Sequence, residues 1–397
     1  ERQETMTIQQ ARPEPTFTAP APGETLAAAK AIRPILMEHR FWADEHARMA
    51  PAAKEAAQRA RLFKLFAPVE LGGCETPLPE MLAIMEELGY SDPTVGWHAG
   101  NSSAIGRGMA QLDPEVGREI FARSDGPFGF SGIAGGTATP VEGGFRLTGS
   151  WQWVTGAYDL EWVALVGLIA GADGAPPNPK LFIVPKADLI IDDTWSVASA
   201  MRGTGSHAVR TQDAFVPSGY VAKVGGKPRI ERPMFFLPPL ISGPVGTSAT
   251  CIGSARLVLE EVKQLVATKV SRADGLAYRD HPWMQKLIGE ASAELDVLSA
   301  GLQSTAEEVW RHAQHGTVPP AIRGNLWATS MLVMDRTRKL TSDLAVISTS
   351  ALYSGRNIVE TTIRDMHAMC ASMETVRSAV DDYGKVLLGM EPTYPLF

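Results

Sequence analysis

The sequence predicts an α+β protein in which a helical segment is followed by a β-rich segment and then by a second helical segment. Apolar residues recur at helical spacing from Glu24 to about Ser124, and short runs rich in valine, isoleucine, phenylalanine and tryptophan continue to about Pro233. Long helical periods then return. We therefore expect an N-terminal α-domain over residues 24–125, a middle β-domain over 126–233 and a C-terminal helical bundle over 234–397.

Residues 1–23 precede the first helical pattern and are expected to form an extended or disordered lead-in. They are polar and have no apolar period, and they contain Pro13, Pro15, Pro20 and Pro22.

Helical periodicity in the first domain begins with Leu26, Ile32 and Leu36. Residues 79–88 form an amphipathic pattern that begins at a proline and is expected to stop at Gly89. Asp92 would cap the next helix, which carries Trp97 and His98.

The middle segment contains three clear strand patterns, at residues 145–149, 162–166 and 181–185. Residues 128–132 are expected to end the first strand, and 171–179 to form an exposed hairpin loop. Beyond Pro233, Leu340, Leu344, Ile347 and Ala351 place one apolar stripe along a helix, which is typical of a helical bundle.

The composition favours a small-molecule partner. The 397 residues are 45% hydrophobic with a formal net charge of −7, and no basic run suggests binding to nucleic acid or an anionic membrane surface. The three cysteines lack the spacing of a zinc site or a disulfide framework. No apolar run reaches the about 18 residues of a membrane span, and no signal peptide is recognised, so we expect a cytoplasmic protein.

Two motifs carry a family resemblance. The first is Trp151-Gln152-Trp153-Val154-Thr155-Gly156, and the second, about fifty residues on, is Met201-Arg202-Gly203-Thr204-Gly205-Ser206 followed by Phe215-Val216-Pro217. Together they resemble the acyl-CoA dehydrogenase superfamily, and within it the two-component (group D) flavin-dependent monooxygenases. The resemblance covers nearly everything after the lead-in. It implies a middle β-barrel or sandwich and a C-terminal four-helix bundle.

The resemblance also implies roles at the flavin. Trp153 would pack on the isoalloxazine, and the Thr155 hydroxyl would reach its N5 atom. Without these roles, Trp153 would be an ordinary core aromatic residue on a strand, and Thr155 would be an ordinary turn residue. Further flavin contacts are implied for Phe130, Ser131, Gly203, Thr204, Ser206, Arg272, Gln285 and Gly355. Ordinary strand ends and helix breaks explain several of these equally well.

The catalytic base of a true dehydrogenase is missing from its family position. Counting from the Arg364-Asp365 pair, Met373 stands where the family has glutamate, with Glu374 one residue later. One residue turns a helical side chain by about 100°, so Glu374 should point away from the site. Ser372 occupies the position of a histidine common in the monooxygenase branch.

The helix that borders the substrate cavity in this family carries Trp97, His98 and Asn101, which with Met373 are candidate substrate contacts. His98 is the best-placed group to take or give a proton. A lone helical histidine is also often a packed or surface residue.

The resemblance therefore implies a monooxygenase that forms a C4a-(hydro)peroxyflavin from O2 and reduced FAD or FMN. A separate flavin reductase would supply the reduced flavin, because no NAD(P)H motif is present. The alternatives are an acyl-CoA dehydrogenase-like oxidase that acts on a CoA thioester with Glu374 or another group as base, and a scaffold that has lost its flavin. A homotetramer built as a dimer of dimers is also implied.

Overall fold

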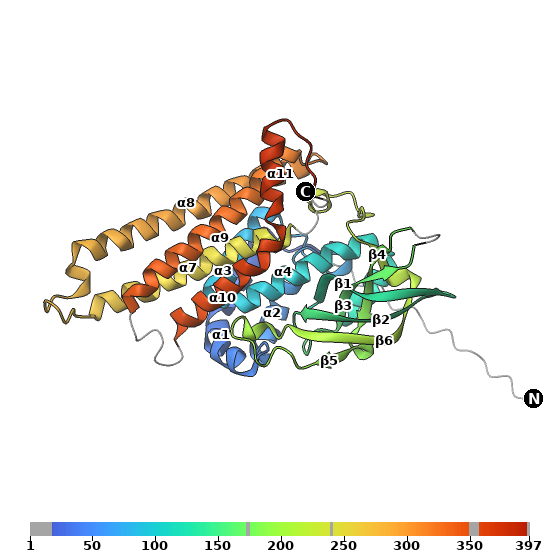
Figure 1. The fold of residues 1–397 in the computed structure, drawn as a ribbon, viewed down its shortest axis with the longest axis horizontal. Coiled ribbons are helices and arrows are strands. Elements are labelled where there is room, and N and C mark those ends of the chain that lie inside the picture. Colours follow the sequence, from blue (N-terminus) through green and yellow to red (C-terminus); the bar gives the residue numbers. More distant parts are fainter. Residues whose placement is uncertain (1–17, 172–174, 239–240, 349–356, 395–397) are drawn as a thin grey trace, which may run out of the picture.

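The computed structural model describes residues 18–171, 175–238, 241–348 and 357–394. Helices come first, strands follow and helices return, which confirms the predicted α+β class (Figure 1). The first helices are α1 (Glu24–His46), α2 (Pro51–Arg59), α3 (Leu78–Ser91), α4 (Pro93–Gly108) and α5 (Pro114–Arg123).

A single sheet forms the middle of the chain, with strand order β5-β6-β2-β1-β3-β4-β7. Its strands are β1 (Gly129–Val141), β2 (Gly144–Val154), β3 (Trp162–Ile169), β4 (Asn178–Pro185), β5 (Ile190–Asp192), β6 (His207–Pro217) and β7 (Val221–Lys223). Strands β1 and β3 pair in parallel, and the other neighbours pair antiparallel. The three predicted strands lie within β2, β3 and β4.

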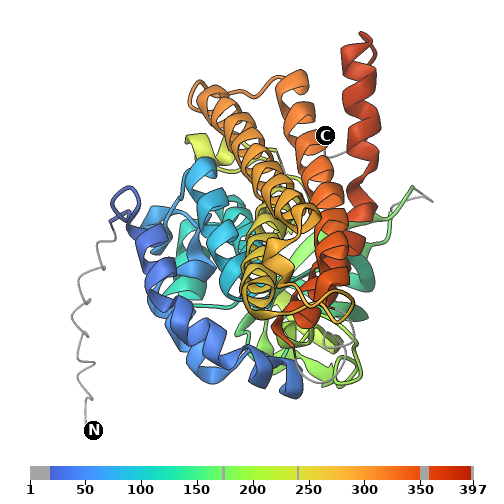
Figure 2. The same cartoon turned by 90° about the vertical axis from the view of Figure 1, so that its left-hand side faces the viewer.

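The last group of helices packs around α7. These helices are α6 (Pro233–Phe236), α7 (Ser242–Thr268), α8 (Pro282–Ala313), α9 (Pro320–Ser348), α10 (Ile358–Met373) and α11 (Ser378–Leu387). Helix α7 contacts α3 and α4 as well as α8, α9 and α10, so it joins the two helical groups. Figure 2 shows the first helices (blue) on one side of the molecule and the last helices (orange to red) on the other. In the described part of the chain, no helix is both long and apolar enough to cross a membrane.

Two sequence-based boundaries need correction. Helix α3 runs past Gly89 to Ser91. A Cβ atom on Gly89 would lie 2.0 Å from the Thr250 carbonyl oxygen, so this glycine permits close contact with α7 and does not stop the helix. Residues 128–132 begin strand β1 and do not end it.

Two other predicted segments are described only in part. Strand β4 already begins at Asn178, inside the predicted loop over residues 171–179. Leu340, Leu344 and Ile347 are buried in the bundle core, whereas Ala351 lies outside the described residues.

Candidate functional site

Trp153 is turned out of the sheet by a local irregularity of strand β2. The pairing of β2 with β6 shifts between Trp151 and Val154, and Trp153 has a φ angle of 59°. Trp151 is buried and donates its Nε1 hydrogen to the Val166 carbonyl oxygen at 2.8 Å, whereas Trp153 is 62% exposed. Left-handed non-glycine residues and β-bulges are concentrated at functional sites. The indole of Trp153 is therefore available to a planar ligand.

Thr155 lies at one end of a chain of buried hydroxyl groups. Its Oγ1 atom accepts a hydrogen bond from Trp97 Nε1 at 3.1 Å and lies 3.1 Å from Ser206 Oγ. Ser206 Oγ lies 2.8 Å from Thr204 Oγ1, which donates to the Met201 carbonyl oxygen at 2.7 Å. The two sequence motifs thus meet in space, one on β2 and the other on the turn before β6.

The acceptor at the end of this chain sets the direction of every proton in it. A carbonyl oxygen only accepts, so the Thr204 hydroxyl donates its hydrogen to Met201 and must accept a hydrogen bond from Ser206. Ser206 then accepts from Thr155, which itself accepts from the indole N–H of Trp97. Thr155 is left with one lone pair and no free hydrogen, so it can serve a further ligand only as an acceptor.

His98 packs beside Gly203 and Phe63 and is not among the residues that line the cavity described below. Its Nε2 atom is 3.4 Å from the Gly203 carbonyl oxygen, its ring packs at 6.4 Å from that of Phe63, and Nδ1 has no partner among the described residues. Burial lowers the pKa of His98 from 6.5 to about 4, so the ring is neutral at pH 7. This placement favours the packing alternative over proton transfer to a substrate.

The lowered pKa of His98 predicts a pH-dependent contribution to stability. His98 takes up a proton near pH 6.5 in the unfolded chain and only near pH 4 in the folded chain. The contribution of the neutral ring to the free energy of unfolding is therefore full above pH 6.5 and is lost as the pH falls. Urea unfolding gives the free energy of unfolding of the wild type and of His98→Gln. The difference between the two should be about 2 kcal/mol smaller at pH 5 than at pH 8. An equal difference at both pH values would contradict the burial of a neutral ring.

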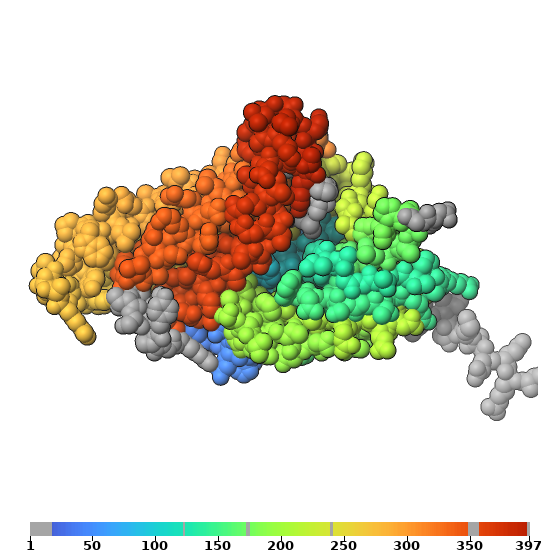
Figure 3. Space-filling model, in the orientation of Figure 1, coloured from blue at the N-terminus to red at the C-terminus, as the bar shows by residue number. Residues whose placement is uncertain are grey.

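An apolar cavity of about 220 Å³ lies between the two helical groups and the start of β1, and it contains three of the predicted substrate residues. Its lining consists of Met85, Gly96, Trp97, Gly100, Asn101, Ala104, Phe130, Ser242, Gly243, Pro244, Thr247, Thr250, Met369, Met373, Thr375 and Val376. No Asp, Glu or His belongs to this set of described residues. Figure 3 shows a hollow between the C-terminal helices (red) and the strands (green).

Trp97 connects this cavity to the hydroxyl chain, because it lines the cavity and its indole N–H is bonded to Thr155. Asn101 also lines the cavity, but its side-chain Nδ2 atom donates to the Trp97 carbonyl oxygen at 2.9 Å. Ser131 is buried in β1, next to Phe130 of the cavity wall. Gly203 is buried too, and a Cβ atom there would lie 2.6 Å from Thr94 Oγ1.

Several predicted residues lie elsewhere. Ser372 is exposed and donates to the Ala368 carbonyl oxygen of its own helix at 3.0 Å. Glu374 is exposed and paired with Arg377 at 2.6 Å, which holds the pKa of Glu374 below its ordinary value. Arg272 and Gln285 are exposed in the described structure around the α7–α8 connection, and Gly355 lies outside the described residues.

The Arg364-Asp365 pair anchors helix α10. Arg364 forms an ion pair with Asp44 of α1, and the buried Asp365 accepts from the Met201 backbone N–H at 2.6 Å. Burial raises the pKa of Asp365 to about 7. The pair thus holds α10 against α1 and the turn that begins at Met201, which positions Met373 in the cavity wall.

Sequence reasoning missed three polar residues of a second cavity, Arg107, Gln111 and Lys223. Arg107 and Gln111 follow the singled-out part of α4, and Lys223 ends the short strand β7. No motif marks them, because their proximity depends on how the end of α4 meets the segment after β7.

Comparison with known proteins finds relatives that are monooxygenases. Residues 245–375 match the family model described as acyl-CoA dehydrogenase, C-terminal domain. The indole-3-acetate monooxygenase of Pseudomonas putida is 27% identical over 77% of this chain and 79% of its own length. The flavin-dependent monooxygenase oxygenase subunit HsaA of Rhodococcus jostii (strain RHA1) is 25% identical over 67% of this chain and 72% of its own.

A solved structure shares the fold over almost the whole chain. XiaF from Streptomyces sp., in complex with FADH2 and glycerol, aligns with a TM-score of 0.87 at 22% identity and covers 94% of this chain and 97% of that protein. At this level of identity the match shows the arrangement of helices and strands, and the roles of individual side chains rest on the geometry above.

Proposed function

We propose that this chain, whose C-terminal helices match the acyl-CoA dehydrogenase family model and whose relatives include flavin-dependent monooxygenases, is the oxygenase component of a two-component monooxygenase. The observation that carries the proposal is the composition of the cavity. Removal of a weakly acidic α-proton needs a positioned base. Met373, which the family spacing puts at the position of the dehydrogenase base, lines the cavity, and the described lining contains no carboxylate or imidazole.

The residues around Thr155 fit a reduced flavin. When bound, such a flavin would react with O2 to form the C4a-(hydro)peroxyflavin that transfers an oxygen atom to substrate. Trp153 offers an exposed aromatic face, and Thr155 offers an acceptor lone pair suited to the N5–H of the reduced ring. We expect the apolar lining of the cavity to disfavour water beside the oxygenated flavin, which would slow its loss as hydrogen peroxide.

The alternative function, oxidation of an acyl-CoA thioester, would need Glu374 or another group as a base. The side chain of Glu374 is exposed and held by Arg377, and it does not line the cavity. Anaerobic reduction separates the two functions. We expect the bound flavin to be bleached by a flavin reductase with NAD(P)H and not by acyl-CoA thioesters. Bleaching by an acyl-CoA under the same conditions would overturn the proposal.

The third possibility, a scaffold without flavin, is tested by titrating the purified protein with oxidised and reduced FAD and FMN. We expect saturable binding that is tighter for the reduced forms, because Thr155 accepts from the N5–H that only the reduced ring carries. The same titration decides between FAD and FMN. Lack of affinity for either flavin would identify a scaffold.

The oligomeric state is part of the proposal. Exposed apolar side chains are spread over α8, α9 and α11, including Val297, Leu332 and Leu387, and they could be buried against other copies of the chain. We propose a homotetramer, which light scattering of the purified protein would test. A monomer at micromolar concentration would contradict it.

Replacing Ser206 by Ala should shorten the lifetime of the oxygenated flavin by about fivefold, the value of one hydrogen bond of about 1 kcal/mol. The substitution frees the Thr155 hydrogen, so this hydroxyl is no longer restricted to accepting. Stopped-flow absorbance after mixing the reduced complex with O2 measures the lifetime. Ser248→Ala removes another buried hydroxyl, bonded to the Val245 carbonyl oxygen, and serves as control. Equal lifetimes in both variants would exclude the proposed direction of the chain.

A further inference from the structure

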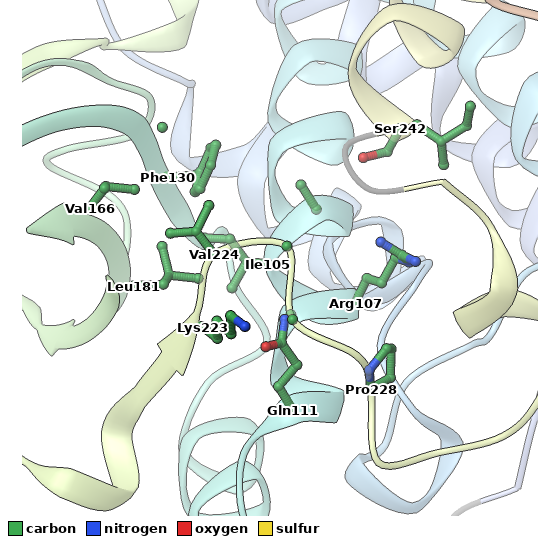
Figure 4. A pocket seen from close by; sticks show the side chains of 16 residues that line it. Ile105, Arg107, Gln111, Phe130, Val166, Leu181, Lys223, Val224, Pro228 and Ser242 are labelled. Atoms are coloured by element: carbon green, nitrogen blue, oxygen red, sulfur yellow. The ribbon is translucent and has the colours of Figure 1, made fainter. Parts of the chain in front are cut away.

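A second cavity adjoins the apolar one, and it carries positive charge. It has a volume of about 150 Å³ and shares Ala104, Phe130 and Ser242 with the apolar cavity as wall residues. Figure 4 shows apolar side chains, including Val166 and Leu181, gathered on one side, and Arg107 and Gln111 at a distance from them. The combined volume of the two cavities lies near the lower end of the range of about 300–1,000 Å³ that is typical of small-molecule binding sites.

Arg107 is a largely buried cation held in place by backbone carbonyl groups. Its Nη2 atom donates to the carbonyl oxygens of Phe235, at 3.3 Å, and Leu237. Burial lowers the pKa of Arg107 to about 10, and no carboxylate contributes to that pKa, so the guanidinium is charged at pH 7 without a counter-ion in the described structure.

The Nε–H of Arg107 is buried and has no acceptor among the described residues. Both hydrogens of Nη2 are donated to carbonyl groups, so the Nε–H and the Nη1 hydrogens are available to bind a ligand. A buried, unpaired charge is costly, and an anion beside it would remove much of that cost. The guanidinium is also preorganised, since its two carbonyl contacts fix its position before a ligand arrives.

Lys223 and Gln111 extend the polar side of this cavity. A Cβ atom on Gly226 would lie 2.3 Å from Gln111 Oε1 and 3.0 Å from Lys223 Cβ, so Gly226 lies close to both residues. The absence of a side chain at Gly226 leaves room for Gln111. Lys223 is exposed and has no ion pair with a carboxylate of the described structure, so it adds positive charge to the wall of this cavity.

We propose that Arg107 binds the carboxylate of the substrate, and that the substrate class is small aromatic carboxylic acids. The aromatic ring would occupy the apolar cavity beside Trp97 and Met373, and the carboxylate would reach past Phe130 to Arg107. Charge-assisted hydrogen bonds of this kind are short and strong, so they would also fix the ring's orientation. This inference rests on the proposed monooxygenase function and adds the substrate class to it.

The proposal is tested by comparing each acid with its neutral partner. Equilibrium dialysis of the flavin-loaded protein would use indole-3-acetate with 3-methylindole, and phenylacetate with toluene. We expect wild-type protein to bind at least one acid about 10- to 100-fold more tightly than its partner. Arg107→Met should bring that ratio to about one without changing the affinity for the neutral partner, and Lys223→Met should lower it less.

Two controls make the result decisive. Arg336→Met removes an exposed arginine that pairs with Glu294 on the bundle, and it should leave the ratio unchanged. Arg107→Lys keeps the positive charge and should retain part of the preference, which covers the case in which Arg107→Met does not fold. Equal binding of acid and neutral partner in both wild-type pairs would overturn the proposal.

The same anion chemistry is present in the phosphate groups of the flavin, and a flavin titration distinguishes the two sources. If Arg107→Met weakens flavin binding and leaves the acid preference intact, the cation serves the cofactor and the substrate proposal is wrong. If wild-type protein binds reduced flavin and fails only in the acid preference, the monooxygenase function stands and the substrate class falls.

Discussion

Replacing Trp153 by Ala is expected to weaken the binding of reduced flavin by about 30-fold, which corresponds to about 2 kcal/mol for the loss of one aromatic stacking contact. The indole is 62% exposed in the structure and is held outside the sheet by a left-handed backbone conformation, so its removal leaves the core intact. Fluorescence titration with reduced FAD and FMN under anaerobic conditions measures the change.

Two variants show whether the effect is specific. Trp153→Phe keeps a smaller aromatic face and should lose only part of the affinity. Trp283, which is 54% exposed at the start of α8, provides the control Trp283→Ala, and this change should leave flavin affinity unaltered. Wild-type affinity in Trp153→Ala would show that the exposed indole has another purpose.

Replacing Thr155 by Val is expected to shorten the lifetime of the oxygenated flavin by about 10- to 100-fold, because an unpaired buried donor costs about 1–3 kcal/mol. Valine has nearly the shape of threonine but cannot accept from the flavin or from Trp97 Nε1. Stopped-flow absorbance gives the lifetime, and hydrogen peroxide release gives the fraction of turnovers that are uncoupled.

The matched variant Thr155→Ser keeps the hydroxyl and should retain most of the lifetime, since the bonds to Trp97 and Ser206 can still form. A Val variant whose oxygenated flavin decays as slowly as that of wild type would remove Thr155 from the proposed chemistry. The loss should exceed that of Ser206→Ala, because Ser206 acts only through Thr155.

The sequence predicts the order of elements well because that order is set by local hydrophobic periods. The strands around residues 145, 162 and 181 and the cap at Asp92 all follow from local pattern and are present. Gly89 shows the limit of such reasoning. A glycine reads locally as a helix end, but its purpose here is to let α3 approach α7, which is far away in sequence.

The candidate site shows the same division. Strict alternation along a strand places Trp151 and Trp153 on one face, and only the irregular pairing with β6 separates the buried indole from the exposed one. The family spacing identified Thr155 and Ser206, but the direction of their hydrogen bonds depends on the Met201 carbonyl group. That His98 is turned toward Gly203 and Phe63 depends on packing between segments far apart in the sequence, which no local pattern encodes.

The proposed function depends most on reduced flavin lying between Trp153 and the acceptor lone pair of Thr155. Rapid mixing of the anaerobic complex of protein and reduced flavin with O2, followed by its absorbance spectrum, tests this most directly. We expect an oxygenated flavin that persists long enough to be resolved before oxidised flavin returns, and whose decay quickens in Thr155→Val. Direct return to oxidised flavin at the rate of free flavin, in wild type and variant alike, would contradict the proposed role of Thr155 at the flavin.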